Sequence, residues 1–282
     1  MNLKALLAHR FPKQRVAYGA KDAILYALSV GAGADPLDPE QLRLVYEEEL
    51  RPLPTLATVL AHSSGWLADP RFEVDYPRLL HGEQHLAVHR PLPARGEVEA
   101  QYSVPAVLDK GAGKGALVYF EKRLTDALSG VPLCTLHSTL FLRGDGGCGG
   151  FGTPPLQLPA GTPACEFTDE IKVTSRAALL YRLNGDLNPI HVDPLAARKV
   201  GFDRPILHGL CTYGTVTYML IRTLCGYDPS RLRSVGARFT APVFPGETLR
   251  LEGARGSDGV HFQASVPERG QVVLAHGLAQ IA

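Results

Sequence analysis

The stretch that decides the fold is His208-Gly-Leu-Cys-Thr-Tyr-Gly-Thr-Val-Thr-Tyr-Met-Leu-Ile-Arg-Thr-Leu-Cys225. Its apolar side chains would cover most of the circumference of a helix, so residues 208–225 are predicted to form a long helix that is buried on nearly all sides. Four runs of strand-forming residues follow, separated by Gly, Pro and Asp: 234–239, 248–254, 260–266 and 272–279. This order predicts an α+β fold in which an antiparallel sheet wraps around a helix.

A segment rich in glycine and proline divides the chain of 282 residues into two parts. It spans residues 143–164 and contains seven Gly and four Pro. Glycine raises backbone entropy and proline interrupts helices and strand ladders, so this composition is typical of a linker. We therefore predict an N-terminal domain of residues 1–142 and a C-terminal domain of residues 165–282.

The two predicted domains resemble each other weakly in sequence. A Leu-Tyr-x-Leu pattern at Tyr26 recurs at Tyr181, 155 positions later, and a proline-rich run ending in Gly-Glu at Gly96 recurs at Gly246, 150 positions later. Two matches in the same order indicate a duplicated unit of domain size rather than a solenoid. The resemblance breaks at residues 185–191, where only the second domain has titratable side chains. The second domain is therefore expected to carry any chemistry.

The loop of residues 185–191 is predicted to lie between short helices at 175–183 and 193–200, and it holds Asp186 and His191 five positions apart. A glycine precedes the aspartate and a proline precedes the Ile-His pair, which restricts the backbone and stiffens the loop. A carboxylate beside an imidazole can divide the roles of acid and base at neutral pH.

Two other interpretations of this loop remain open. In the first, Asp186 and Asn188 only cap helices, and His191 is a neutral histidine satisfied within the fold. In the second, His191 and Asp193 are metal ligands, which is weaker because a zinc site uses three or four ligands.

A second feature, the pair His208-Gly209, begins the long helix. The first N–H groups of a helix have no partner within the helix, and the helix dipole is positive there. Gly209 has no side chain to block a ligand, so this end suits a carbonyl oxygen that gains negative charge during a reaction. The same residues would also serve at an ordinary helix start.

Together, Asp186-x-Asn188-Pro189-x-His191 and His208-Gly209 resemble the signature of the MaoC-like (R)-specific enoyl-CoA hydratases, also called hydratase 2. This resemblance implies a double hot-dog fold, in which two repeats each wrap an antiparallel sheet around a long helix. It also implies reversible syn hydration of trans-2-enoyl-CoA to (3R)-3-hydroxyacyl-CoA, with no cofactor. The resemblance extends over most of the chain, at residues 22–28, 81–84, 109–111 and 245–248.

The resemblance also implies roles for individual residues. Asp186 and His191 would hold and activate the water and protonate the α-carbon, with the division between them open because a coupled pair titrates as a pair. Asn188 would orient the site, and the N–H of Gly209 would polarise the thioester carbonyl. The substrate contacts implied are His81, Gly82, Gln84 as a weaker candidate, Lys110 and Phe239.

Two motifs in the first domain are explained without a metal or a nucleotide. Three histidines four positions apart, from His81 to His89, are flanked by Gly and Pro, so a strand is predicted and a zinc-protease helix is not. The glycine-rich run 111–116 superficially matches a dinucleotide fingerprint, but a strand follows it. We predict a flexible hairpin, in which the resemblance favours Lys110 as a binder of CoA phosphates; Lys114 is either a second contact or part of a solvated turn.

Composition limits the partners and the compartment. Lys plus Arg is 29 and Asp plus Glu is 28, and this net charge of +1 argues against nucleic acid as the main partner. Five cysteines without a Cys-x-x-Cys pair indicate a reduced intracellular protein with no thiolate zinc site. No apolar run reaches the ~20 residues of a membrane span. Neither a signal-peptide core nor a peroxisomal C-terminus is recognisable, so a cytoplasmic location is predicted.

The expected partner is therefore an enoyl-CoA or 3-hydroxyacyl-CoA. A homodimer is predicted by analogy, because hot-dog sheets commonly pair edge to edge. Two other functions remain open: a non-catalytic acyl-CoA-binding subunit, and a hot-dog acyl-CoA thioesterase.

Overall fold

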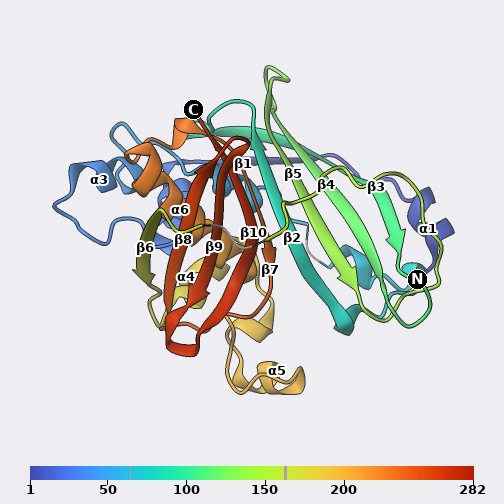
Figure 1. Cartoon of the computed structure of the whole chain (residues 1–282). Helices are drawn as coiled ribbons and strands as arrows, with labels where there is room; N and C mark the ends of the chain where they lie inside the picture. The colour runs from blue at the N-terminus through green and yellow to red at the C-terminus, as the bar shows by residue number, and fades with distance from the viewer. Residues whose placement is uncertain (64, 162–163) are drawn as a thin grey trace.

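The structure, a computed structural model, describes residues 1–63, 65–161 and 164–282. These residues form one ten-stranded antiparallel sheet in the order β1-β3-β4-β5-β2-β7-β10-β9-β8-β6 (Figure 1). The strands are β1 (Gln14–Tyr18), β2 (Leu79–Val88), β3 (Gly96–Asp109), β4 (Ala116–Asp126), β5 (Pro132–Leu142), β6 (Phe167–Lys172), β7 (Leu232–Phe239), β8 (Thr248–Gly256), β9 (Gly259–Val266) and β10 (Gln271–Ile281).

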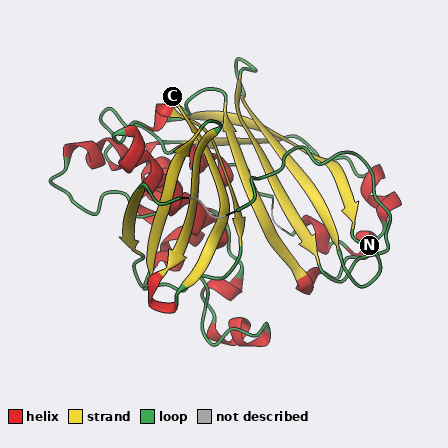
Figure 2. Cartoon of the chain, in the orientation of Figure 1, coloured by secondary structure: helices red, strands yellow, loops and turns green. Residues whose placement is uncertain are grey.

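The helices gather largely on one side of this sheet (Figure 2). The α-helices are α1 (Leu3–Ala8), α2 (Ala20–Ser29), α3 (Pro39–Val45), α4 (Ala177–Tyr181), α5 (Pro194–Lys199) and α6 (Gly209–Cys225). The 3-10 helices are η1 (Pro54–Thr58), η2 (Trp66–Ala68), η3 (Pro70–Phe72), η4 (Tyr76–Arg78), η5 (Arg182–Asn184), η6 (Pro189–His191), η7 (Pro229–Arg231) and η8 (Pro267–Arg269). In the second half of the chain, each helix and strand predicted from the pattern is present.

The two halves of the sheet have the same topology. Strands β1 to β5 are arranged 1-3-4-5-2 from the outer edge inward, and β6 to β10 repeat that order as 6-8-9-10-7. The halves meet where β2 pairs with β7, and there Glu83 lies opposite Arg238 and accepts from its Nη2 at 2.6 Å. The duplication therefore builds one continuous sheet rather than two separate ones, which is the double hot-dog arrangement.

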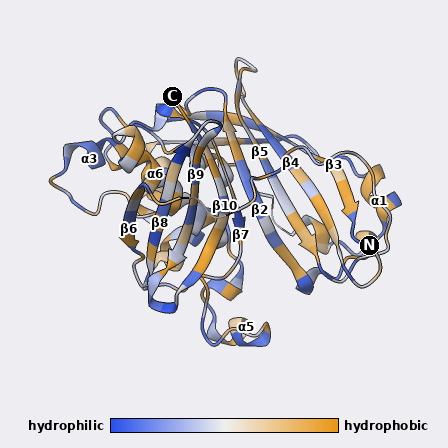
Figure 3. Cartoon of the chain, in the orientation of Figure 1, coloured by the Kyte–Doolittle hydropathy of each residue, from blue (hydrophilic) through white to orange (hydrophobic). Residues whose placement is uncertain are grey.

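Strand residues alternate between the core and the outer face. In β9, for example, every second residue from Val260 to Val266 is buried, and the hydropathy colouring alternates along the strands (Figure 3). Period-two alternation places apolar side chains on the face that packs against the helices. The inner face of the sheet thus forms one wall of a shared core.

Helix α6 is the buried helix of the second half, and twelve of its 17 residues are buried. Helix α2 packs directly onto it, because a Cβ at Gly214 would lie 2.6 Å from the hydroxyl oxygen of Tyr26. The first half departs from the expected long helix in each repeat. Between β1 and β2 it has α2 and α3 and then only the short helices η1 to η4, with an aromatic cluster in which Trp66 and Phe120 lie 5.1 Å apart between ring centroids.

The described part of the segment between β5 and β6, predicted to be a linker, lies against the outer face of the sheet. Its glycines allow close backbone approach: a Cβ at Gly146 would lie 2.0 Å from the carbonyl oxygen of Gly111, and one at Gly152 would lie 2.1 Å from that of Pro105. Side chains farther along, including Leu158, cover β2 and β7. Close packing against neighbouring backbone therefore requires glycine at these two positions.

Among the residues that the structure describes, none of the helices combines the length and the apolar character needed to span a membrane.

Candidate active site

The loop between η5 and η6 is built to hold Asp186 and Asn188 in fixed positions. Gly185 ends η5 with a φ of +117°, a left-handed conformation that glycine adopts without strain. The Asn188 side chain caps η6 by accepting from the N–H of Ile190 at 3.2 Å. The Asp186 Oδ1 accepts from the N–H of Asn188 at 3.2 Å. The helix-capping interpretation is thus correct for Asn188.

His191 is the buried end of this loop. Its Nδ1 lies 2.9 Å from the carbonyl oxygen of Ile206. A carbonyl can only accept, so Nδ1 carries the proton and Nε2 has a free lone pair. Burial lowers the pKa of His191, although the Ile206 carbonyl and the Asp186 carboxylate act in the opposite direction. The imidazole is therefore neutral at pH 7 and able to accept a proton at Nε2.

His208, the residue before α6, lies against both members of this pair. Its ring stacks on that of His191, with centroids 3.7 Å apart and an interplanar angle of 25°. Its Nε2 lies 3.1 Å from the carbonyl oxygen of Asp186. Burial, and next His191, lower the pKa of His208 to about 4. The His-Gly pair is recognisable in the sequence, but the motif assigns no role to this histidine.

The N-terminus of α6 provides N–H groups toward the site. His208 is the N-cap residue and its side chain makes no capping bond. Within the described parts of the chain, the N–H of Gly209 has no hydrogen-bond partner. A Cβ at Gly209 would lie 3.4 Å from the ring of Phe239, which is an ordinary contact. Phe239, the last residue of β7, therefore lies beside the helix N-terminus, and glycine keeps that space open.

The first half contributes the start of β2. The ring of His81 lies 4.9 Å from that of Phe239, between centroids, and its Nε2 donates to the carbonyl oxygen of Glu83 at 3.1 Å. Burial lowers the pKa of His81 to about 4. At Gly82 a Cβ would lie 3.2 Å from the carbonyl oxygen of Thr139. The structure thus brings His81, Gly82 and Phe239 together beside Gly209.

Gln84 is less available for a ligand than expected. It is buried, its amide nitrogen donates to the carbonyl oxygen of His85 at 3.0 Å, and its amide oxygen accepts from the hydroxyl of Ser138 at 2.8 Å. Both ends of the amide are therefore occupied within the sheet.

Lys110 lies in the turn between β3 and β4, with its Nζ 5.1 Å from the ring centroid of Phe141. The turn is tied down rather than flexible, because the Asp109 carboxylate accepts from the N–H groups of Gly111, Gly147 and Gly149, each at 2.8 Å. Strand pairing places this turn three strands from the start of β2, a lateral distance of about 14 Å. Both Lys110 and Lys114 are exposed.

His62 is a further residue of this neighbourhood that the sequence does not reveal. It is partly buried, and burial, followed by the charge of Lys122, lowers its pKa, whereas Asp186 raises it. Its charge also acts on His81. No motif surrounds His62, and only the path of the chain after η1 brings it toward the loop.

Asp186, His191 and His208 have ligand atoms within 4.8 Å of one another, the spacing of a possible metal site. The two rings are stacked, however, so their lone pairs lie in nearly parallel planes and do not converge on one point. The alternative pair, His191 and Asp193, is also disfavoured, because the Asp193 carboxylate caps α5 by accepting from the N–H of Leu195 at 2.8 Å. The donor geometry therefore does not fit a metal ion.

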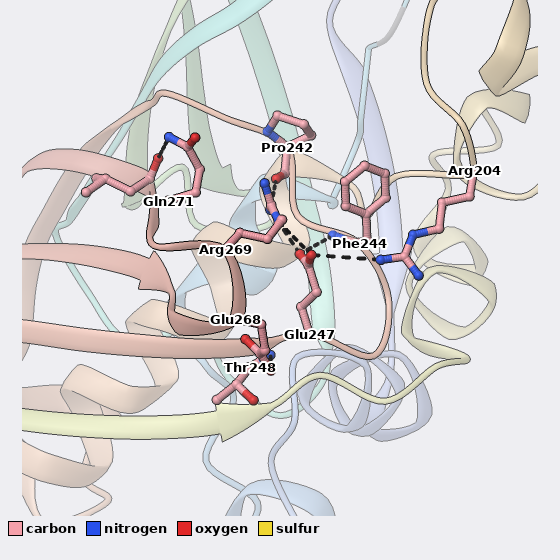
Figure 4. Close-up of polar contacts among 9 residues, drawn as sticks. Arg204, Pro242, Phe244, Glu247, Thr248, Glu268, Arg269 and Gln271 are labelled. Atoms are coloured by element: carbon pink, nitrogen blue, oxygen red, sulfur yellow. Dashed lines mark hydrogen bonds and ion pairs between the residues drawn. The ribbon is translucent and has the colours of Figure 1, made fainter.

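Polar contacts around Glu247 and Arg269 close the loop before β8 (Figure 4). The buried Glu247 carboxylate accepts from the Phe244 N–H at 2.8 Å and from Arg269 Nε at 2.7 Å. Arg269 also donates to the carbonyl oxygen of Pro242 at 2.8 Å. In this loop, the carbonyl oxygen of Val243 accepts from the N–H of Leu207 at 2.7 Å. Leu207 directly precedes His208, so the loop holds the start of α6. The Pro-Gly-Glu motif is thus a structural brace for the site.

Comparisons with known proteins show the family of this chain. Residues 160–276 match the family model described as MaoC like domain, and residues 16–144 match that described as MFE-2 hydratase 2 N-terminal domain. The peroxisomal enoyl-CoA hydratase 2 of Arabidopsis thaliana is 38% identical over 297 aligned positions, covering 97% of this chain and 94% of that protein.

Solved structures give the same result. A MaoC-like dehydratase from Phytophthora capsici matches with a TM-score of 0.87 at 32% identity, covering 100% of this chain and 99% of the other. A Mycobacterium tuberculosis protein described as having a double hotdog fold matches at 16% identity with a TM-score of 0.53, covering 97% and 96%, and this likeness shows the fold alone. Full-length similarity to a named enoyl-CoA hydratase 2, together with both family models, places this chain in the MaoC-like enoyl-CoA hydratase 2 family.

Proposed function

We propose that the protein catalyses the reversible syn hydration of trans-2-enoyl-CoA to (3R)-3-hydroxyacyl-CoA. The observation that carries the proposal is that a carboxylate lies close to a neutral imidazole with a free lone pair. The free N–H at the start of α6 directly follows His208, whose ring stacks on that imidazole. Such a set can activate water and stabilise an enolate at the same time. Asp186, His191, Asn188 and Gly209 are the residues to which we assign the chemistry.

In the proposed reaction, one water molecule binds between His191 Nε2 and the Asp186 carboxylate. Its oxygen adds to the β-carbon while the pair takes up one proton, and the pair returns one proton to the α-carbon on the same face. The amide nitrogen of Asn188 orients the water. Asp186 and His191 therefore act as a single coupled unit, and the reaction needs no oxidant, reductant or metal.

The N–H of Gly209 accounts for activation of the double bond. During addition, negative charge develops on the thioester oxygen, and a preorganised donor at the positive end of α6 stabilises it. His81, Gly82 and Phe239 would form the wall on the opposite side of the acyl thioester, and Lys110 would contact the CoA phosphates as a point charge. No cofactor is expected.

The test is the loss of the conjugated enoyl-thioester absorbance when the enzyme is added to a panel of enoyl-CoAs that differ in length and branching. We expect Asp186→Asn and His191→Ala to lower kcat at least about 100-fold, because general acid–base catalysis contributes on the order of 10²–10⁴. Asp258→Asn and His89→Ala are matched controls in exposed positions. Unchanged turnover in both site variants contradicts the assignment of roles.

The same assay separates the two alternative functions. A non-catalytic acyl-CoA-binding subunit would bind acyl-CoA saturably without any loss of enoyl absorbance. A thioesterase would release free CoA thiol, which a thiol reagent detects. We expect hydration without thiol release.

Assembly and compartment form a separate part of the proposal. We propose a homodimer located in the cytoplasm, although the Arabidopsis relative is peroxisomal. Light scattering on the purified protein tests the dimer, and imaging of a fluorescent fusion in its own cell tests the compartment. A monomer, or an organellar signal, overturns the corresponding part and leaves the activity unaffected.

A further inference from the structure

His208 contacts the ring of His191 and the backbone of Asp186, the two residues to which the proposed function assigns acid–base chemistry. Its ring lies 3.7 Å from the ring of His191, centroid to centroid, at an angle of 25°. Its Nε2 lies 3.1 Å from the backbone oxygen of Asp186. The side chain is almost wholly buried, with 1% of its surface exposed, so it is part of the support behind the site.

The hydrogen bonds fix the tautomers of the two imidazoles. The carbonyl oxygen of Asp186 can only accept, so His208 carries its proton on Nε2. Its Nδ1 is buried without a hydrogen-bond partner among the described residues. His191 carries its proton on Nδ1, directed at Ile206. Each ring is therefore anchored by one N–H to a backbone carbonyl, and the two neutral rings face each other.

The ring of His208 has a second aromatic neighbour. The ring of Tyr181 lies 5.0 Å away between centroids, at 47°, and Tyr181 is itself buried. His208 is thus in contact with both Tyr181 and His191. A ring held by buried neighbours can transmit the rigidity of the core to a catalytic side chain, whose position must hold within a fraction of an ångström.

We propose that His208 is a positioning residue, which keeps the His191 ring in plane by stacking and keeps the Asp186 loop in place through its Nε2–H. This inference rests on the proposed function for its kinetic part only. His208 itself does not exchange a proton with substrate, because its one N–H is used by a backbone carbonyl and its other nitrogen is buried against the protein.

Two variants remove one contact each. His208→Gln keeps an amide nitrogen able to donate to the Asp186 carbonyl but loses the stacking ring. His208→Phe keeps a ring against His191 but loses the donor. We expect each to lower kcat about 10- to 100-fold, by analogy with the cost of misplacing reacting groups by about 1 Å. The KM for enoyl-CoA should change less than about threefold, because His208 lies behind the loop.

A double-mutant cycle distinguishes positioning from general structural damage. If His208 acts through His191, adding His208→Gln to His191→Ala should lower kcat no further, since groups that act as a unit are strongly non-additive. A merely structural role predicts that the two losses multiply. The proposal is overturned if the loss of kcat in the double variant equals the product of the two single losses. It is also overturned if both His208 single variants keep the wild-type kcat.

Nitrogen-15 NMR of the wild-type protein provides a measurement that depends neither on turnover nor on a variant that folds. We expect His208 in the Nε2–H form and His191 in the Nδ1–H form at pH 7. Finding the opposite tautomer at either ring overturns the inference. If the wild-type protein shows these tautomers but hydrates no enoyl-CoA, the proposed function fails while the anchoring of His191 by His208 stands.

Discussion

The rings of Tyr26 and Tyr181, 155 positions apart in the chain, pack against each other with their centroids 6.1 Å apart. The Ser29 hydroxyl accepts from the amide nitrogen of Asn184 at 3.2 Å, and these residues are also 155 positions apart. Equivalent residues of a duplicated unit meet in this way only where a local twofold axis relates the two copies. The weak repeat in the sequence thus corresponds to a contact in the core, directly behind the loop that holds Asp186.

The hydroxyl of Tyr26 gives a test of how this contact is stabilised. It is buried without a hydrogen-bond partner among the described residues, so Tyr26→Phe removes an unsatisfied polar group. We expect the free energy of unfolding to stay the same or rise. The matched control is Tyr213→Phe, whose hydroxyl donates to the carbonyl oxygen of Val235 at 2.8 Å and whose loss should cost about 1–2 kcal/mol. Urea unfolding measures both; an equal loss in the two variants contradicts the expectation.

Two glycines on α6 should respond in opposite ways to alanine. At Gly209 the new methyl would only touch Phe239 at 3.4 Å, so the fold should be kept and the melting temperature unchanged or raised. The methyl would, however, cover the free N–H, and kcat should fall on the order of 10²–10³-fold. At Gly214 the methyl would lie 2.6 Å from the Tyr26 hydroxyl, so overpacking should cost about 1–3 kcal/mol of stability. Full activity of Gly209→Ala would contradict the proposal that the Gly209 N–H stabilises the thioester oxygen.

The brace around Glu247 should matter for both stability and turnover. Glu247→Gln would weaken its hydrogen bonds to Arg269 and Phe244, and we expect a loss of about 1–3 kcal/mol in the free energy of unfolding. Because this loop holds Leu207 next to His208, kcat should fall too. Glu252→Gln, on the neighbouring strand β8, is the control. Thermal melting and enoyl-CoA hydration assays measure the two effects. A Glu247→Gln variant with wild-type stability and wild-type kcat would show that the brace is dispensable.

Lys122 should make stability depend on pH. It is buried, its Nζ donates to the carbonyl oxygens of Ala57, Thr58 and Leu60 at 2.7, 3.1 and 2.9 Å, and burial lowers its pKa to about 7. Between pH 7 and its ordinary pKa of 10.5, the unfolded chain holds a proton at Lys122 that the folded chain has released. The wild-type free energy of unfolding should therefore rise with pH in that window, by at most about 1.4 kcal/mol per pH unit from this group.

Lys122→Met removes this contribution. From pH 7 to 9.5, the free energy of unfolding of the wild type should therefore rise relative to that of the variant. Lys4→Met, at an exposed position, is the control and should parallel the wild type. Urea titrations at three pH values measure this. Identical pH dependence in wild type and Lys122→Met would show that the folded-state pKa of Lys122 is not lowered.

Local patterns in the sequence predicted most elements of the second half, although not the strand β6, and singled out the loop that holds Asp186 and His191. The apolar run of α6, the alternation of β7 to β10 and the Gly185 and Pro189 that shape the loop all act over a few residues, so they can be recognised without knowing the rest of the fold. The resemblance to hydratase 2, which rests on those same residues, is confirmed by the full-length comparison with the Arabidopsis enzyme. The individual residue roles remain predictions.

The sequence by itself determined the duplication, the helix that the second sheet surrounds and the position of the reactive loop, because each depends on the order and spacing of neighbouring residues. Only the tertiary structure decided that the long helix has no counterpart in the first half, and that the glycines after β5 serve close packing across the sheet. Only it stacked His208 on His191 and brought His81 beside Phe239. These contacts join segments far apart in the chain, and their energies depend on burial and distance in three dimensions, which no local pattern contains.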